Sequence, residues 1–251
     1  MINLSKQLCK HKLLIPYITL GDPDMETCEN LICDMADCGA DAVILGLPFS
    51  DPIAESEIIT CSSVRAYSAG VDADKIFNSI VNVRARSDVY LILATYANIP
   101  FCVGVEKFIK RMKSAGVDGL IVYDAPQEEK EEFALPCARA GISYISQAVI
   151  GYTQRAVTKA THKDGFLFWL PQNDVITDKD ISFVKGIKAA ADMPCVIALD
   201  NPDEKAANAA AEISDGIIVE SGVVRIIHSL GKKCAKSVQE YIRALKSAIC
   251  G

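Results

Sequence analysis

The sequence lacks the features of a membrane, secreted or nucleic-acid-binding protein. No uninterrupted apolar run approaches the roughly 20 residues that a membrane-spanning helix needs. The first residues, Met1 to Gln7, are too polar for a signal peptide. Lys and Arg number 26 against 32 Asp and Glu, and no basic run could follow a phosphodiester backbone. We therefore expect a cytoplasmic protein that binds neither a membrane nor nucleic acid.

Metal-binding and disulfide patterns are also missing. The histidines His11, His162 and His228 lie far apart, and none of the ten cysteines forms a CxxC pair. The cysteines are scattered through apparent helices and strands, which is typical of reduced thiols in a large domain. We predict no metal site and no disulfide framework.

The length and composition predict one large domain. The chain has 251 residues, of which 50% are hydrophobic and 23% charged, so it has ample apolar surface to bury. This length is typical of one (β/α)8 barrel and leaves nothing for a second domain. We expect residues 1–251 to form a single TIM-barrel domain.

Short apolar runs alternate with amphipathic stretches, as in βα units around a parallel sheet. The expected strands are residues 13–20, 42–47, 89–96, 119–124, 143–150, 165–170, 194–199 and 216–220. The expected helices include 26–38, 74–84, 105–115, 128–140, 179–191, 203–212 and 236–249, with an extra helix after Pro52 in the long second connection. The fold class is therefore α/β, as a (β/α)8 barrel. A doubly wound sheet is the main alternative, but no Gly-rich fingerprint follows the first strand.

A weak internal echo recurs where helices end and strands begin. It reads Cys-Gly-Ala-Asp-Ala-Val at 38–43, Ala-Gly-Val-Asp-Gly-Leu at 115–120 and Ser-Asp-Gly-Ile at 214–217. Gly suits a left-handed helix end, and Asp orders the turn that follows. We interpret the echo as turn chemistry rather than as a catalytic motif.

Several longer motifs resemble the tryptophan synthase α-subunit family. The first is Ile-Pro-Tyr-Ile-Thr-Leu-Gly-Asp-Pro at 15–23, and the second is Leu-Gly-Leu-Pro-Phe-Ser-Asp-Pro-Ile-Ala at 45–54. Tyr-Ala-Asn at 96–98 and Asp-Ala-Pro at 124–126 follow in the family's order. The resemblance covers nearly the whole chain and is strongest up to about residue 126. It implies a TIM-barrel lyase of tryptophan biosynthesis that cleaves indole-3-glycerol phosphate to indole and glyceraldehyde 3-phosphate.

The resemblance also implies a partner and a set of site residues. In this family the indole passes to a β subunit that carries pyridoxal phosphate, and the α-like chain itself needs no cofactor. An indole-like ligand would contact positions matching Tyr17, Tyr96, Phe168 and Ser221. The family's catalytic Glu falls at Ile44, which cannot transfer a proton. Its loop Asp becomes Glu55, and Glu57 lies two residues on, so these are the candidate catalytic residues; alternatively, such carboxylates only favour the dipole of the next helix.

The family's phosphate-binding residues are changed too. Its Gly-Phe-Gly is Val-Ile-Ala at 196–198, and its Gly-Ser is Glu220-Ser221. Side chains at these positions block the close backbone approach that cradles phosphate, and Glu220 repels it. The loop 171–177 lacks the family's Arg and hinge glycines. Ser221 then reads as an ordinary helix cap.

Residues that would face the β subunit are retained. They are Pro48, Ser50, Asp51, Asn98, Phe101, Asp124 and Pro126. Since Pro, Asp and Asn also shape loops, the same residues could serve architecture alone. The leading hypothesis is a subunit that docks on and modulates a β chain without the usual cleavage. The alternatives are an active lyase using Glu55 or Glu57, on a substrate with or without phosphate, and a binding barrel without a reaction, against which a filled apolar mouth around Ile44 would argue.

Overall fold

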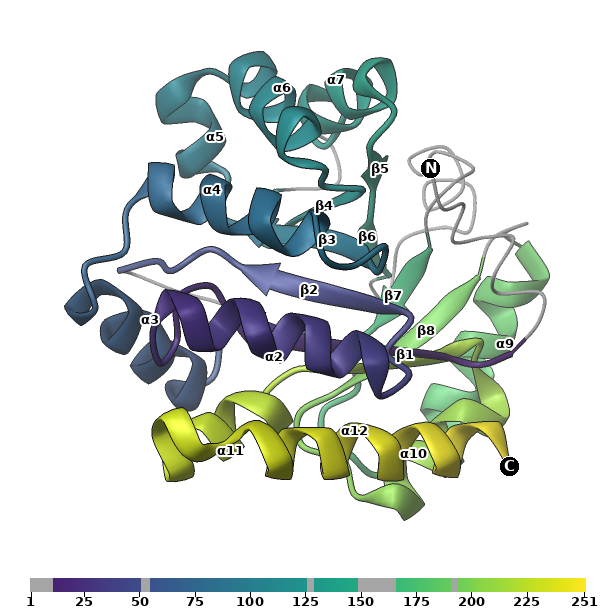
Figure 1. Ribbon diagram of the computed structural model, residues 1–251. Helices are drawn as coiled ribbons and strands as arrows, with labels where there is room; N and C mark the ends of the chain where they lie inside the picture. Colours follow the sequence, from purple (N-terminus) through teal and green to yellow (C-terminus); the bar gives the residue numbers. More distant parts are fainter. Residues whose placement is uncertain (1–10, 51–54, 126–128, 149–165, 191–193) are drawn as a thin grey trace.

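The computed structural model describes residues 11–50, 55–125, 129–148, 166–190 and 194–251. In these segments nine parallel strands form one sheet that curls into a nearly closed barrel, with helices on its outside (Figure 1). The strands are β1 (Leu13–Thr19), β2 (Ala42–Gly46), β3 (Tyr90–Thr95), β4 (Gly119–Val122), β5 (Ser143–Tyr144), β6 (Ser146–Ala148), β7 (Leu167–Trp169), β8 (Cys195–Leu199) and β9 (Gly216–Val219). The predicted (β/α)8 fold is confirmed.

The barrel closes at Ile145. The strand order is β5, β4, β3, β2, β1, β9, β8, β7, β6, so the two ends of the order are joined by this one residue. β5 pairs with β4, whereas β6 pairs with β7. The single strand predicted over 143–150 is therefore two short strands, because its first part and its second part serve different neighbours. Residues 149 and 150 lie outside the described segments.

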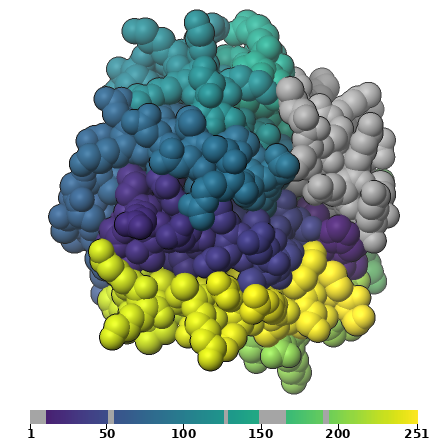
Figure 2. Space-filling model, viewed as in Figure 1, coloured from purple at the N-terminus to yellow at the C-terminus, as the bar shows by residue number. Residues whose placement is uncertain are grey.

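The helices cover the outer face of the sheet. They are α2 (Met25–Asp37), α3 (Glu57–Ser68), α4 (Ala73–Arg84), α5 (Asn98–Val103), α6 (Val105–Ala115), α7 (Glu131–Ala140), α9 (Asp178–Ala190), α10 (Glu204–Ile213), α11 (Gly222–Leu230), the 3-10 turn η1 (Gly231–Lys233) and α12 (Ala235–Cys250). Figure 2 shows α2, α4 and α12 packed side by side over one face of the molecule. The second connection holds both α3 and α4, which confirms the extra helix. No helix of the described segments is long and apolar enough to cross a membrane.

One helix, α5, was not predicted. It spans only six residues and contains Pro100, so it is too short to show a helical repeat of apolar residues. Its first residue, Asn98, follows β3 almost directly. α5 therefore lies at the carboxyl end of the barrel, where functional loops of this architecture are found.

Alternate residues of each strand face two separate cores. On β2, Ala42 and Ile44 belong to the core inside the barrel, while Val43 and Leu45 belong to the core between the sheet and the helices. This is the two-residue period of a strand buried on both faces. It directs the side chain of Ile44 into the barrel interior.

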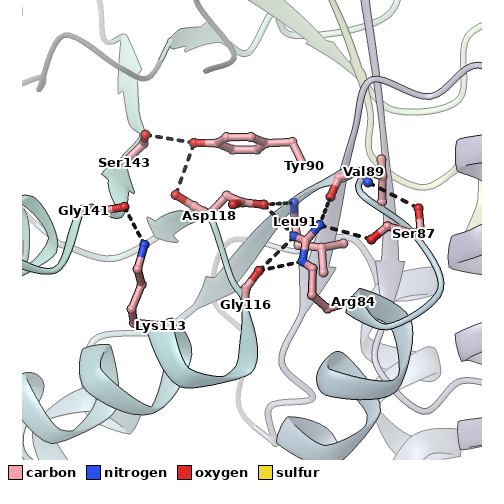
Figure 3. A network of polar contacts seen from close by, with 10 residues as sticks. All are labelled: Arg84, Ser87, Val89, Tyr90, Leu91, Lys113, Gly116, Asp118, Gly141 and Ser143. Carbon is pink, nitrogen blue, oxygen red and sulfur yellow. Dashed lines mark hydrogen bonds and ion pairs between the residues drawn. The ribbon is translucent and has the colours of Figure 1, made fainter. Parts of the chain in front are cut away.

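The echoed aspartates tie neighbouring strands together at the amino end of the barrel. Asp118 accepts the backbone N–H of Leu91 at 3.0 Å and pairs with Arg84 at 2.6 Å (Figure 3). Asp41 likewise accepts from the N–H of Leu14 and pairs with Lys246.

Asp215 completes the set. It accepts the backbone N–H of Cys195 at 2.8 Å and pairs with Lys188 at 2.6 Å. In each echo, the Asp carboxylate thus accepts a backbone N–H near the start of the neighbouring strand and pairs with a cationic side chain from a helix. The interpretation of the echo as turn chemistry is consistent with all three contacts.

Candidate functional site

Five side chains meet where the strands end. Tyr17 lies near the end of β1, and Glu55, Tyr96, Tyr123 and Glu220 follow β2, β3, β4 and β9. Because parallel strands place their carboxyl ends at one end of a barrel, these residues share it. Burial is the main cause of the raised pKa of Tyr17 and of Tyr123, and the charges of Glu55 and Glu220 add to it for both. We call these five residues the barrel mouth.

Ile44 fills the layer beneath the mouth. It is 2% exposed, pairs in register with Tyr17 and Ile92, and belongs to the inner apolar core. The Tyr17 side chain lies over Gly46, where an added Cβ would come within 1.9 Å of the phenol oxygen. Phe168, another predicted substrate contact, is buried in the same core. The interior at this level is therefore occupied by the chain's own side chains, as in other packed barrels.

Glu55 is the carboxyl group that reaches the mouth from the second connection. Burial raises its pKa to about 7. Its buried Oε2 atom has no hydrogen-bond partner among the residues that the structure describes. A carboxyl group that titrates near neutrality can hold or release a proton at physiological pH.

Glu57, the other candidate acid, is exposed in the first turn of α3. In that position a carboxylate favours the helix dipole. The structure therefore brings Glu55, and not Glu57, to the buried mouth residues.

Glu220 is the second carboxyl group of the mouth. Its pKa is raised to about 7, first by burial and then by the charges of Asp200, Asp174 and Glu55. Within the described segments its side chain forms no hydrogen bond or ion pair. A phosphate at this end of β9 would meet a carboxyl group that already repels three neighbours.

The backbone N–H groups after β8 are occupied by a side chain of the protein. The carboxylate of Asp174 accepts the N–H of Asp200 at 2.6 Å and that of Asn201 at 2.9 Å. Such adjacent N–H groups are typical phosphate ligands in barrels. Asp174 thus fills with its own negative charge the place where an anionic ligand would be held. This role was not predicted from the sequence, although an acidic residue in the loop 171–177 could have indicated it.

Ser221 is a packing residue rather than a helix cap. It stands at the N-cap position of α11, but its side chain makes no cap hydrogen bond. Instead its hydroxyl donates to the carbonyl oxygen of Asp200 at 3.2 Å and accepts from Arg225 Nε at 2.8 Å. The prediction of a cap was wrong, because the Ser221 hydroxyl is hydrogen-bonded to Asp200 and Arg225 instead.

Aromatic rings line the side of the mouth near β3 and β4. Tyr96 stacks on Phe49 with ring centroids 4.7 Å apart. The centroid of Tyr123 lies 5.8 Å from that of Tyr96. Tyr123 was not among the predicted site residues, although an aromatic residue directly after β4 could have indicated it.

The retained loop motifs form a connected surface beside the mouth. Asp124 accepts the N–H of Ala97 at 2.7 Å, and Tyr67 donates to the carbonyl oxygen of Pro48 at 2.8 Å. Among the predicted interface residues, Ser50, Asn98, Phe101 and Asp124 are exposed and Pro48 is buried. Asp51 and Pro126 lie outside the described segments.

Apolar side chains extend this surface along α5. Phe101 is 47% and Val103 52% exposed. Behind them lies a cavity of about 640 Å³. It is lined by Leu47, Pro48, Tyr67, Val71, Asp72, Ala73, Ile76, Phe77, Ile99, Cys102, Val103, Lys107, Phe108 and Arg111. The lining includes none of the five mouth residues, so this hollow is separate from the mouth.

Comparison with known proteins gives one consistent family. Residues 4–249 match the family model described as tryptophan synthase alpha chain. The tryptophan synthase alpha chain of Geotalea daltonii is 34% identical over 96% of this chain and 94% of its own. The structure is similar to that of tryptophan synthase subunit alpha from Legionella pneumophila, with TM-score 0.89, 25% identity and coverage of 99% and 98%. It is also similar to a chain of the tryptophan synthase complex from Pyrococcus furiosus, with TM-score 0.86, 27% identity and coverage of 94% and 98%.

Proposed function

The chain belongs to the tryptophan synthase alpha chain family, and from that premise we propose that it docks on a β-type subunit and modulates it without the usual cleavage of indole-3-glycerol phosphate. The observation that carries the proposal is Ile44, buried among apolar side chains where the resemblance expects the proton-transferring Glu. A general acid–base group contributes about 10²- to 10⁴-fold to a rate. The aliphatic side chain of Ile44 contributes none of this.

The altered phosphate site supports the same proposal. Asp174 occupies the N–H groups after β8, and Glu220 adds a carboxyl group at the end of β9. A phosphate ester would have to displace the Asp174 carboxylate and would lie near the Glu220 carboxyl group. Two like charges about 5 Å apart repel by roughly 3 kcal/mol at an effective dielectric near 20, which exceeds the net gain from one hydroxyl hydrogen bond.

The docking half of the proposal rests on the surface beside the mouth. Apolar Phe101 and Val103 stand on the short helix α5, which begins at the exposed polar residue Asn98, and Ser50 after β2 is exposed as well. An apolar centre with a polar rim is the usual composition of a protein interface. One structural relative is a tryptophan synthase complex. In this proposal the α-like chain carries no cofactor, and pyridoxal phosphate belongs to the β partner.

The test of docking is to mix the purified chain with its cognate β chain. We expect the two to co-elute in size-exclusion chromatography and the conversion of indole to tryptophan to rise. Phe101→Asp should abolish both effects, because it places a charge at the apolar centre of the surface. The matched control is Val81→Asp, since Val81 is equally exposed, at 47%, on α4. If the unaltered chain neither co-elutes with the β chain nor changes its turnover, docking is contradicted.

A second candidate function is a lyase that uses Glu55. The observation in its favour is that Glu55 is partly buried at the mouth, that its Oε2 atom has no partner in the described part of the chain, and that burial raises its pKa to about 7. Such a group could transfer protons that Ile44 cannot. This function requires indole release from indole-3-glycerol phosphate, or from an analogue without phosphate, that is lost in Glu55→Gln. Release that persists in Glu55→Gln would exclude Glu55 as the acid.

A further inference from the structure

We propose that the barrel mouth binds a small organic ammonium ion in place of a phosphate ester. This inference goes beyond docking and does not depend on it, because it concerns a ligand of the isolated chain. The site would consist of the carboxyl groups of Glu55 and Glu220 with the rings of Tyr17, Tyr96 and Tyr123.

The first observation is negative charge on two partly buried carboxyl groups, neither of which forms an ion pair with any residue that the structure describes. Glu220 and Glu55 interact with each other electrostatically, and Asp174 and Asp200 add to the negative potential at Glu220. Arg225, a cationic side chain that contacts the end of β8, is paired with Asp200 at 2.9 Å and donates to the Ser221 hydroxyl at 2.8 Å. Buried carboxylates without a partner are costly, so the mouth favours either protons or a cationic ligand.

A second and independent observation is the aromatic wall. Tyr96 stacks on Phe49. The ring centroid of Tyr123 lies 5.8 Å from that of Tyr96, and the two ring planes are inclined at 51°, so the wall consists of both ring faces and ring edges. Ammonium groups are attracted to the negative faces of such rings and bind in aromatic cages. Carboxyl groups close enough to the tyrosines to raise the pKa of Tyr17 and Tyr123 therefore suit an alkylammonium group attached to a flat apolar body.

The third observation is that the backbone N–H groups that could bind an anion are already occupied. Asp174 already accepts both N–H groups after β8, at 2.6 and 2.9 Å, so an anion would find no free donor there. The layer below is closed by Ile44 and Phe168. The ligand would therefore sit among the tyrosines and not in the interior of the barrel.

The mouth also predicts how binding depends on pH. When it is empty, Glu55 and Glu220 titrate near pH 7 because burial raises the pKa of both. An ammonium ion favours their charged forms, so binding must release protons and strengthen as pH rises. A group with a pKa of about 7 is ionised about tenfold more at pH 8 than at pH 6.

The experiment is isothermal titration calorimetry of the isolated chain with tryptamine at pH 6, 7 and 8. Indole-3-propionate serves as an anion of similar size. We expect tryptamine to bind, with at least tenfold higher affinity at pH 8 than at pH 6, and the anion not to bind. Titrations at pH 7 in phosphate and in Tris, which differ in ionisation enthalpy, should show that protons leave on binding.

The variants make the assignment specific. Glu220→Gln should lower the affinity for tryptamine at least tenfold, and Glu55→Gln should also lower it and reduce proton release. The matched control is Glu240→Gln, an exposed residue of α12 that should leave both unchanged. Circular dichroism checks that each variant is folded. If one of the two mouth variants does not fold, the other alone tests the proposal.

Three outcomes would overturn the proposal. They are equal binding of the anion, an affinity independent of pH, and unchanged binding by both folded mouth variants. Displacement of tryptamine by millimolar magnesium chloride would also overturn it, because that result would indicate an inorganic cation site.

Discussion

The carboxylate of Asp174 accepts the backbone N–H of Asp200 at 2.6 Å, so the turn after β8 is already satisfied by an anion that the chain supplies. The contact joins the loop after β7 to the end of β8. It explains why the loop 171–177 carries an acidic residue here: the carboxylate caps donors that are otherwise open to a ligand. The position of this side chain leads to the first prediction.

Removing the Asp174 carboxylate should open the anion site. In the double variant Asp174→Ala/Glu220→Gly, 10 mM phosphate should raise the melting temperature, whereas it should leave the unaltered chain within error. A ligand at 100 times its Kd stabilises a protein by about 2.7 kcal/mol, and a change of 1 kcal/mol shifts Tm by roughly 2–4 °C in a domain of this size. Asp178→Ala, an exposed change in α9, is the control. An equal shift in the unaltered chain would show that Asp174 does not block the site.

The partly buried Glu220 should lower stability at high pH. Its pKa is raised to about 7 in the folded chain, mainly by burial, above the usual value of 4.5. The folded state therefore keeps its proton longer than the unfolded state does. The resulting cost is absent below about pH 4.5, grows as pH rises to about 7, and is complete above that.

Glu220→Gln should remove this cost. We expect the variant to be more stable than the unaltered chain by about 1–3 kcal/mol at pH 8, and the difference to vanish near pH 4.5. Urea unfolding at pH 4.5, 6 and 8 measures it. A constant difference at all three pH values would mean that Glu220 does not titrate as its burial indicates.

Ile44 should behave as a packing residue. It is 2% exposed in the inner core, so Ile44→Ala should cost about 2–5 kcal/mol and Ile44→Val about 0.5–1.5 kcal/mol. Ile44→Val should retain docking on the β chain at unchanged affinity. Ile44→Ala variants that lose no stability would show that the layer beneath the mouth is open, contrary to the packing described above.

The turn aspartate Asp118 should be needed for the fold and not for the site. It accepts from the N–H of Leu91 and pairs with Arg84, whose guanidinium also donates to the carbonyl oxygen of Gly116 (Figure 3). Asp118→Ala leaves these donors without their acceptor, so we expect a loss of about 2–4 kcal/mol in urea unfolding. The control is Glu132→Ala, an exposed residue of α7, which should change stability by less than about 0.5 kcal/mol. Unchanged stability of Asp118→Ala would contradict the structural role.

The barrel was predictable because its signal is carried by regular repetition. Strands such as β1 and β2 are continuous apolar runs, and helices such as α6 and α12 repeat apolar residues at helical spacing. α5 could not be predicted, since six residues with a proline carry no period. The split of the fifth strand into β5 and β6 depends on which neighbour each half pairs with, and that is a property of barrel closure.

The site was only partly predictable. Ile44 and Glu220 could be singled out from the sequence, because each has a known place in the motifs that resemble the family. The contact between Asp174 and the N–H groups of Asp200 and Asn201 does not, because it joins segments 26 residues apart through backbone atoms. The raised pKa of Glu55 is likewise a result of burial. Burial of a loop side chain depends on how the second connection folds over the strand ends.

The most direct measurement is release of indole from indole-3-glycerol phosphate by the purified chain at micromolar concentration, with and without a saturating β chain. The account predicts release no faster than the uncatalysed reaction in both cases, while the β chain converts added indole to tryptophan faster in the presence of this chain. Indole release at several turnovers per second would contradict this expectation. A β chain whose conversion of indole to tryptophan is unchanged by this chain would contradict it as well.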